Sequence, residues 1–329
     1  MPISNNDLYN NILVVGLLST GSSALVDILS EYDNINTIQG EFNDYRAPGL
    51  VADQLCEVNT NNIYNHIKSI TTTRKKLGIA YRIIPVLNLS LDAFKGIRKR
   101  YCDSSVRIKQ LNLLSKLNSK LVANIPVEEK IRCANDWIKS VGNIREKKNS
   151  HVLFNQPLLT STNTNIWKQV FDPYKLIIVY RNPRDQLADI IKNDRLYAAY
   201  GAPYVNYGGV TLETIFGRSR EGALNMHIAA IQKRYDWIDS LKKDIPKNNF
   251  LLLDFEGLVN DYERYLNAIE NFIGGIKSHH KRNRQYFNPD NAKKSIGIYN
   301  QYLTETETEF TEELMSWYKK TLNSNNIIA

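Results

Sequence analysis

The sequence is poor in cysteine and has no long apolar run. Its three cysteines, Cys56, Cys102 and Cys133, are odd in number and lack the paired spacing of metal ligands. Reduced thiols in a cytoplasmic compartment are therefore expected. No run is long enough to cross a bilayer, and the first residues lack the basic and apolar regions of a signal peptide. A disulfide scaffold and a membrane-spanning protein are excluded, whereas peripheral membrane contact stays open.

The charge of the chain is positive but not concentrated. The net charge of +8 is distributed along all 329 residues, and 43% of the residues are hydrophobic. This composition is typical of a globular protein with a sizeable core. Since no basic block stands out, the charge favours a bound nucleotide or an acidic glycan over a long nucleic acid.

Short apolar runs alternate with helical patterns along most of the chain. The runs at 12–16, 151–155, 175–180 and 250–255 are rich in the residues of strands buried on both faces, and a further strand is predicted at 34–40. Amphipathic patterns between them predict helices, so we expect an α/β fold with a central, mainly parallel sheet. Residues from about 49 to 150 read as helical, which predicts a helical insertion within a single domain of residues 1–329. The glycine-rich, basic segment 274–291 predicts a mobile loop.

A glycine loop follows the first predicted strand. Gly16 and Gly21 have the G-x-x-x-x-G spacing of a phosphate-binding loop, but Ser22 takes the place of the lysine. Backbone N–H groups and the dipole at the start of the following helix can bind a phosphate without a side-chain charge. Further hydroxyl donors could come from Ser19, Thr20, Ser22 and Ser23. A tight turn without a ligand is the alternative.

Three more segments of the sequence contain patterns that bear on the function. YKLIIVYRNPRDQLADI (174–190) contains R-x-P-x-D at Arg181, Pro183 and Asp185. Together with FLLLDFEGLVNDYERYLNAIENFIG (250–274) and FNPDNAKKSIGIYNQYLTETE (287–307), it resembles sulfotransferases that use 3′-phosphoadenosine-5′-phosphosulfate (PAPS), in particular bacterial members linked to surface glycans. The resemblance implies a three-layer sandwich with the P-loop-like sulfotransferase fold.

The same resemblance implies how the donor is held. The loop that begins at Gly16 would bind the 5′-phosphosulfate, and Arg181 would bind the 3′-phosphate through a forked contact; no metal is required. Two residues depart from the family pattern. Ser19 stands where the family has its catalytic lysine or arginine, and Asp189 stands where a serine usually contacts the 3′-phosphate. Three interpretations of these departures stay open. In the first, Lys293 or Lys294 restores the missing positive charge; in the second, the donor is another activated nucleotide; in the third, the protein binds its ligand without catalysis.

The acceptor needs a general base within hydrogen-bond reach. GEFNDYRAPG (40–49) follows the second predicted strand and contains Glu41, the candidate base, with Asp44 and Arg46 as acceptor-binding residues. A solvated ion pair on a surface turn is the alternative. Gln156 follows the third strand and is a further acceptor-binding candidate. His151 starts that strand, at the opposite end, and is expected to be structural.

The sequence therefore predicts transfer of a sulfuryl group from PAPS to a hydroxyl of a carbohydrate, such as a bacterial surface glycan or its precursor. Tyrosines at 197–209 could recognise the sugar. No nucleic-acid partner is expected, and a homodimer is compatible with the sequence. A P-loop kinase or NTPase, and a non-catalytic nucleotide- or glycan-binding protein, are the alternatives.

Overall fold

The computed structural model describes residues 10–16, 19–47, 49–56, 104–145, 150–158, 166–193, 195–196 and 219–324. The tyrosine-rich segment 197–209 and residues 57–103 of the predicted insertion lie outside these ranges. The chain divides into two compact units, and each is described by itself. One unit comprises Met1–Thr37, Asn149–Ser161 and Pro173–Ala329, and the other comprises Ile38–Lys148 and Thr162–Asp172.

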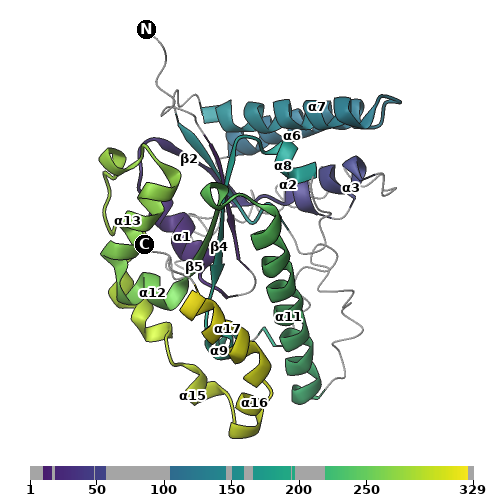
Figure 1. The fold of residues 1–329 in the computed structure, drawn as a ribbon. Helices are drawn as coiled ribbons and strands as arrows, with labels where there is room; N and C mark the ends of the chain where they lie inside the picture. The colour runs from purple at the N-terminus through teal and green to yellow at the C-terminus, as the bar shows by residue number, and fades with distance from the viewer. Residues whose placement is uncertain are drawn as a thin grey trace, which may run out of the picture. The chain divides into compact units, whose positions relative to one another are not determined.

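A five-stranded sheet has the strand order β2-β3-β1-β4-β5 (Figure 1), and all of it except the second half of β2 belongs to the first unit. The strands are β1 (Asn11–Val15), β2 (Ile35–Glu41), β3 (His151–Asn155), β4 (Tyr174–Tyr180) and β5 (Phe250–Asp254). β1 pairs in parallel with β3 and with β4, and β4 pairs in parallel with β5. The carboxyl ends of β3, β1, β4 and β5 therefore share one edge, where ligands bind in open α/β sheets.

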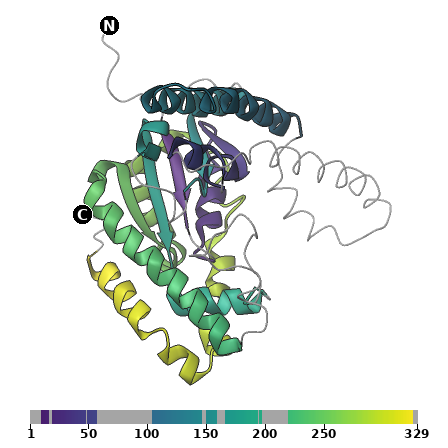
Figure 2. The same cartoon turned by 90° about the vertical axis from the view of Figure 1, so that its right-hand side faces the viewer.

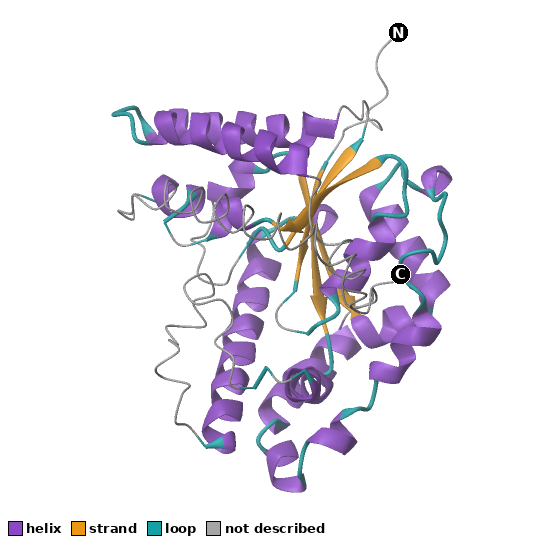
Figure 3. Cartoon of the chain, turned by 180° about the vertical axis from the view of Figure 1, so that it is seen from behind, coloured by secondary structure: helices purple, strands orange, loops and turns teal. Residues whose placement is uncertain are grey.

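Helices cover both faces of this sheet (Figures 1 and 3). α1 (Ser22–Leu29), α12 (Phe255–Asn260) and α13 (Tyr262–Ile273) lie on one face, whereas α9 (Pro183–Lys192), α11 (Arg220–Asp244) and α17 (Glu312–Ser324) lie on the other (Figure 2). The shorter elements are η2 (Lys247–Asn249), η3 (Lys277–His279), α14 (Pro289–Ala292), η4 (Lys293–Ser295), α15 (Tyr299–Tyr302) and α16 (Glu305–Glu309).

The core explains why the apolar runs form strands. Every residue of β1 is buried, as expected of a central strand covered on both faces. Ile12 and Val14 pack with the apolar side chains of α1, α12 and α13. On the other face of the sheet, Tyr180 contacts Trp317 and Tyr318 of α17 edge to face. The prediction of an α/β fold with a mainly parallel central sheet is confirmed.

The second unit is largely helical. It contains α2 (Asn43–Arg46), α3 (Val51–Leu55), α6 (Ser104–Leu121), α7 (Val127–Gly142), η1 (Asn143–Arg145) and α8 (Ile166–Val170). Phe42 stacks on Trp137 of α7 and meets Phe171 edge to face, so rings from distant parts of the sequence form its centre. The Asn135 side chain donates hydrogen bonds to the carbonyls of Gln169, Val170 and Asp172. The single domain with an insertion at about 49–150 stays a prediction.

Segment 274–291, expected as a mobile loop, is held by the buried carboxylate of Glu31. Its Oε1 accepts hydrogen bonds from the backbone N–H groups of Tyr286 and Phe287 at 2.7 and 3.2 Å. Its Oε2 accepts from Arg284 N at 3.0 Å and contacts His280 Nε2 at 2.9 Å. The sequence composition of the segment gave no sign of this distant acceptor.

Within the described ranges, no helix is long and apolar enough to cross a membrane. Over the same residues, no group of three or more histidine, cysteine, aspartate or glutamate side chains is arranged to hold a metal ion.

Candidate functional site

The glycine loop lies between the end of β1 and the start of α1, and steric packing explains both glycines. A Cβ on Gly16 would approach Thr20 Oγ1 to 2.3 Å and Ser22 Cβ to 2.6 Å. Gly21 has φ +88°, and a Cβ there would lie 2.1 Å from the ring of Phe255. The loop is therefore packed against its own side chains and against the start of α12, which only glycine permits at these positions.

The polar groups of the loop fit an anion. Ser19 has φ 55°, in the left-handed region that is unfavourable for serine. The hydroxyls of Ser19 and Thr20 are buried, and neither has a hydrogen-bond partner among the described residues. Gly21, the N-cap residue of α1, has no side chain that could accept from the first N–H groups of the helix. These donors suit the 5′-phosphosulfate of PAPS, which the sequence predicts here.

Gln156, predicted to bind the acceptor, contacts the glycine loop, and its role toward the acceptor stays a prediction. Its Oε1 accepts a hydrogen bond from Gly16 N at 3.1 Å, and its Nε2 donates to Ser22 Oγ at 2.8 Å. The residue has φ 52° directly after β3, which turns its side chain to the neighbouring strand end. The position of the kinase lysine is thus occupied by a hydroxyl bonded to Gln156. Ser23, one residue further, is exposed.

Arg181, at the end of β4, joins three segments. Its Nη1 donates to the carbonyl of Ser19 at 2.9 Å, and its Nη2 donates to the carbonyl of Ser295. The guanidinium also lies over the ring of Phe255, 5.0 Å from the centroid. The side chain is only 4% exposed. In this arrangement the guanidinium contacts the glycine loop, while its predicted contact with a 3′-phosphate stays a prediction.

Asp185 explains why the segment around Ser295 reaches the site. Its buried carboxylate accepts hydrogen bonds from Gly297 N at 2.7 Å and from Tyr299 N at 3.1 Å. These contacts place η4, with Lys293 and Lys294, beside the strand ends. Lys293 pairs with Asp290 at 3.0 Å. Lys294 is exposed and forms no ion pair with a described residue, so it is the freer of the two predicted cations.

The turn from β5 into α12 contains a pair of carboxylates, on the buried Asp254 and the partly buried Glu256, that the sequence analysis did not predict. Both Asp254 and Glu256 accept a hydrogen bond from the hydroxyl of Tyr318, each at 3.1 Å. Glu256 also accepts from Asn182 N, and its Oε1 lies 3.8 Å from Nε of Arg181. Burial and the neighbouring Asp254 raise the pKa of Glu256 to about 8. An acidic residue directly after a buried strand, as in LLLDFE, was the available signal.

Asp189 and Arg184 lie on α9, and His151 lies at the start of β3. Asp189 is half-buried on α9. Arg184, five residues before it, pairs with Glu312 and donates to Thr311 Oγ1 at 3.0 Å. His151 lies at the opposite edge of the sheet, at the start of β3, where its Nδ1 accepts from Asn10 N at 3.2 Å.

The predicted acceptor residues belong to the second unit. Arg46 pairs with Glu41 and donates through Nε to Asn43 Oδ1 at 2.9 Å. The side chain of Glu41 is 54% exposed, whereas that of Arg46 is 5% exposed. Both carboxylate oxygens of Asp44, which is buried, accept from Arg107 of α6. Asp44 thus forms a bidentate ion pair, and Glu41 retains an accessible carboxylate with a fixed cation beside it.

No protein family matches the chain, and no curated protein matches it. Among solved structures, it is similar to the sulfotransferase domain from the Synechococcus PCC 7002 olefin synthase, with 14% identity, 88% of this chain and 82% of that chain covered, and a TM-score of 0.44. It is also similar to sulfotransferase STF9 from Mycobacterium avium, with 10% identity, coverage of 94% and 76%, and a TM-score of 0.45. A third is the sulfotransferase domain from the curacin biosynthetic pathway, with 10% identity, coverage of 94% and 98%, and a TM-score of 0.44.

Proposed function

We propose that this protein is a sulfotransferase that moves a sulfuryl group from PAPS to a hydroxyl of a carbohydrate. The observation that carries the proposal is the donor loop itself. Two buried hydroxyls without a partner among the described residues, on Ser19 and Thr20, lie before a helix start that has no side-chain cap. Such a site satisfies its own polar groups when an anion binds.

The sequence of the contacting segments supports PAPS as the donor. The loop contacts Arg181 of the R-x-P-x-D segment, and Arg181 contacts Ser295 of the C-terminal segment. These are the segments whose sequences resemble the PAPS-dependent family. A bisphosphorylated nucleotide requires two anion sites on one sheet edge, and the loop and the Lys294 region offer them.

In the proposed reaction, the acceptor oxygen forms a bond to sulfur while the bond between sulfur and the bridging oxygen of the 5′-phosphate breaks. The electron pair stays on the phosphate, so adenosine 3′,5′-bisphosphate leaves. The proton of the acceptor hydroxyl passes to Glu41, whose carboxylate is held by Arg46. A bacterial surface glycan or its precursor is the proposed acceptor class.

Thermal denaturation with nucleotides tests the donor. Adenosine 3′,5′-bisphosphate is expected to raise the Tm, and adenosine 5′-monophosphate at the same concentration is expected to raise it much less, because it lacks the second anion. Equal stabilisation by both nucleotides, or turnover of ATP with magnesium, would contradict the proposal and favour another donor or a kinase.

Variants of Glu41 test the base. With PAPS and a panel of glycans, Glu41→Gln is expected to lower sulfuryl transfer about 10²- to 10⁴-fold while the nucleotide still raises the Tm. Glu309→Gln, on the exposed surface of α16, serves as the matched control and should retain full transfer. Tight nucleotide binding by the unmodified protein with no sulfated product from any glycan would favour a non-catalytic binding protein.

A further inference from the structure

A compact group of acidic and phenolic side chains lies beside Arg181, entirely within the first unit. Asp254 ends β5, Glu256 belongs to the first turn of α12 and Tyr318 comes from α17. Asp254 is 3% exposed, and the side chain of Glu256 is 13% exposed. The proposed function assigns no role to these two carboxyl groups, although they lie next to the arginine that is proposed to bind the donor.

The hydrogen bonds of this group need one proton more than two ionised carboxylates supply. The hydroxyl of Tyr318 lies 3.1 Å from Oδ1 of Asp254 and 3.1 Å from Oε2 of Glu256, but it has a single hydrogen to share between them. The two carboxyl groups are also hydrogen-bonded to each other, and two ionised carboxylates have no hydrogen for such a bond. One proton held by the pair satisfies all of these contacts.

Burial and mutual repulsion explain why the pair retains this proton at neutral pH. Full ionisation would place two negative charges side by side where water scarcely reaches, which disfavours the doubly charged state. Burial raises the pKa of Asp254 as well as the pKa of Glu256, which is about 8. The pair therefore has one negative charge below about pH 8 and gains a second one above it.

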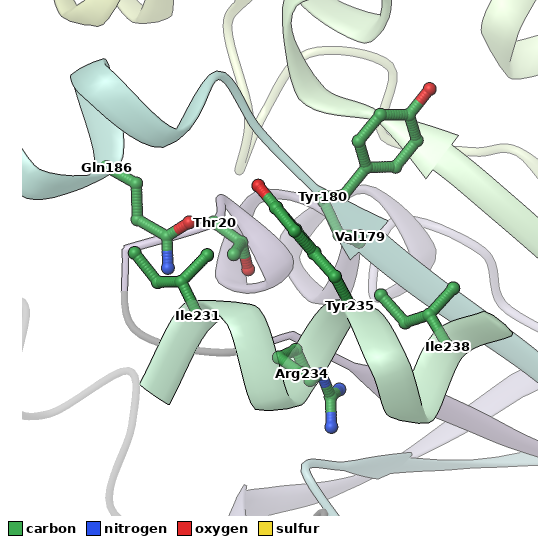
Figure 4. Close-up of a pocket in the computed structure, with 8 residues that line it drawn as sticks. All are labelled: Thr20, Val179, Tyr180, Gln186, Ile231, Arg234, Tyr235 and Ile238. Atoms are coloured by element: carbon green, nitrogen blue, oxygen red, sulfur yellow. The ribbon is translucent and has the colours of Figure 1, made fainter. Parts of the chain in front are cut away.

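The other groups that face the pair do not titrate in this range. Burial raises the pKa of Tyr318 and the pKa of Tyr235, and it raises the pKa of Tyr265 to about 12. Figure 4 shows Tyr235 projecting from α11 toward the end of β4. The cation that faces the pair is Arg181, and a guanidinium stays protonated at all of these pH values. A change of charge near pH 8 is therefore assigned to the two carboxyl groups.

The backbone fixes the pair relative to Arg181. Asn182 N, one residue further along the chain, donates to both oxygens of Glu256 at 3.1 and 3.2 Å. Nε of Arg181 lies 3.8 Å from Oε1 of Glu256 and has no hydrogen-bond partner among the described residues. A pair with one negative charge balances the guanidinium, whereas a pair with two leaves an excess negative charge where an anion is expected to bind.

We propose that Asp254 and Glu256 share a proton that keeps Arg181 attractive to an anion, so that anion binding at Arg181 is coupled to the protonation of this pair. Glu256 is then a positioning residue, which acts on the ligand through Arg181. The inference rests on the proposed function, in which the anion is the 3′-phosphate of the donor. It adds a regulation by pH: the affinity for the donor falls when the pair loses its proton to the solvent.

Calorimetric titration of the full chain with adenosine 3′,5′-bisphosphate between about pH 7 and 9.5 tests the coupling, because phosphate groups lose their second proton at about pH 6. The affinity of the unmodified protein is expected to fall about tenfold over this range, since a second negative charge then lies beside Arg181. Near pH 8, binding should also take up a fraction of a proton, which titrations in buffers of different ionisation enthalpy measure.

Glu256→Gln keeps an acceptor for Asn182 N but cannot ionise, so its affinity should stay nearly constant over this range and its binding should take up no proton. A purely structural role of Glu256 would instead lower the affinity of the variant equally at every pH, which would overturn the proposal. The matched control is Glu313→Gln, on the exposed face of α17, which should keep the pH dependence of the unmodified protein.

Tyr318→Phe is a second variant that keeps the proposal testable if Glu256→Gln does not fold. It removes the hydrogen bond that favours the charged form of Asp254, so the pair should hold its proton to a higher pH. The fall in affinity for the nucleotide should then begin at a higher pH than in the unmodified protein. A fall at an unchanged or lower pH would contradict the shared proton.

Inorganic sulfate, which does not titrate in this range, separates the inference from the proposed function. If the nucleotide binds the unmodified protein and Glu256→Gln with the same pH dependence, the donor stands and the coupling is overturned. If the nucleotide binds neither protein while sulfate binds with a pH dependence that Glu256→Gln abolishes, the coupling stands and PAPS is not the donor. Failure of both anions to bind would overturn both proposals.

Discussion

Gln156 shows how a single amide can set the shape of a glycine loop. It accepts from the N–H of Gly16 and donates to the hydroxyl of Ser22, so it fixes both ends of the loop. The sequence places Gln156 directly after β3, which predicts a site residue at this strand end. It does not show that Gln156 bonds to Ser22, because the two residues are 134 positions apart and only the pairing of β3 with β1 brings them together.

Gln156→Glu is expected to weaken binding of adenosine 3′,5′-bisphosphate at least tenfold with little loss of stability. The carboxylate can still accept from Gly16 N, and the Ser22 hydroxyl can rotate to donate to it. The new negative charge beside the loop then repels the anion. Calorimetric titration measures the affinity. Gln232→Glu on α11 is the control and should bind normally; equal binding by both variants would refute the role of Gln156.

His151 predicts how stability depends on pH. Burial lowers the pKa of His151 from 6.5 to about 4, and its Nδ1 must stay unprotonated to accept from Asn10. The folded state therefore has the lower pKa, and the unfolded state takes up the proton first as the pH falls. The contribution of His151 to the free energy of unfolding is therefore complete above about pH 6.5. It is lost as the pH falls from 6.5 to 4, and the loss is on the order of 3 kcal/mol.

Urea denaturation of the native protein and of His151→Gln at pH 7, 6, 5 and 4.5 tests this dependence. The variant has no titrating ring at this position, so its free energy of unfolding should decline less over the same range. Parallel decline in the two proteins would show that other groups cause the pH dependence.

At the scale of elements, Glu31 at the end of α1 determines the conformation of the segment that follows α13. Its carboxylate is fully buried and accepts from three backbone N–H groups between Arg284 and Phe287. Glu31→Gln places an NH₂ group against these donors and should cost about 3 kcal/mol. Hydrogen exchange measures the effect directly, because the amides of Tyr286 and Phe287 should lose protection before those of β1.

Glu263→Gln is the matched control for this element. Glu263 also contacts Arg284, through its side chain, but is 65% exposed. Its substitution should change stability by less than about 0.5 kcal/mol. Loss of protection in Glu263→Gln equal to that in Glu31→Gln would assign the ordering of the segment to the surface ion pair.

At the scale of the molecule, the apolar runs predicted the five strands to within a residue or two at each end. β3 was predicted at 151–155 and spans His151–Asn155. The sequence also placed the glycine loop, Gln156 and Arg181 at strand ends. It did not reveal the Asp254–Glu256 pair, because the shared partner of these residues, Tyr318, lies more than 60 positions further along the chain. Asp44 and Arg46 were predicted from proximity in sequence, which does not show that Asp44 is bound to Arg107.

Donor binding predicts a pattern of protection across the molecule. All the contacts proposed for the nucleotide belong to the first unit, so adenosine 3′,5′-bisphosphate should slow hydrogen exchange in residues 19–25, 181–186 and 293–299. Exchange in α6 and α7 should change much less. Protection that is as strong in α6 and α7 as in the loop would contradict a donor site built from the first unit.

The bond between Arg181 and the carbonyl of Ser295 spans 114 positions of the chain. During synthesis, the glycine loop and α9 leave the ribosome long before Ser295 exists. At a synthesis rate of roughly 5–20 residues per second, Ser295 is added to the chain several seconds or more after Arg181. Ser295, Gly297 and Tyr299 thus join Arg181 and Asp185 only after more than a hundred further residues have been made. A product terminated before Ser295 can therefore contain the glycine loop and still lack the contacts that hold Arg181 in place.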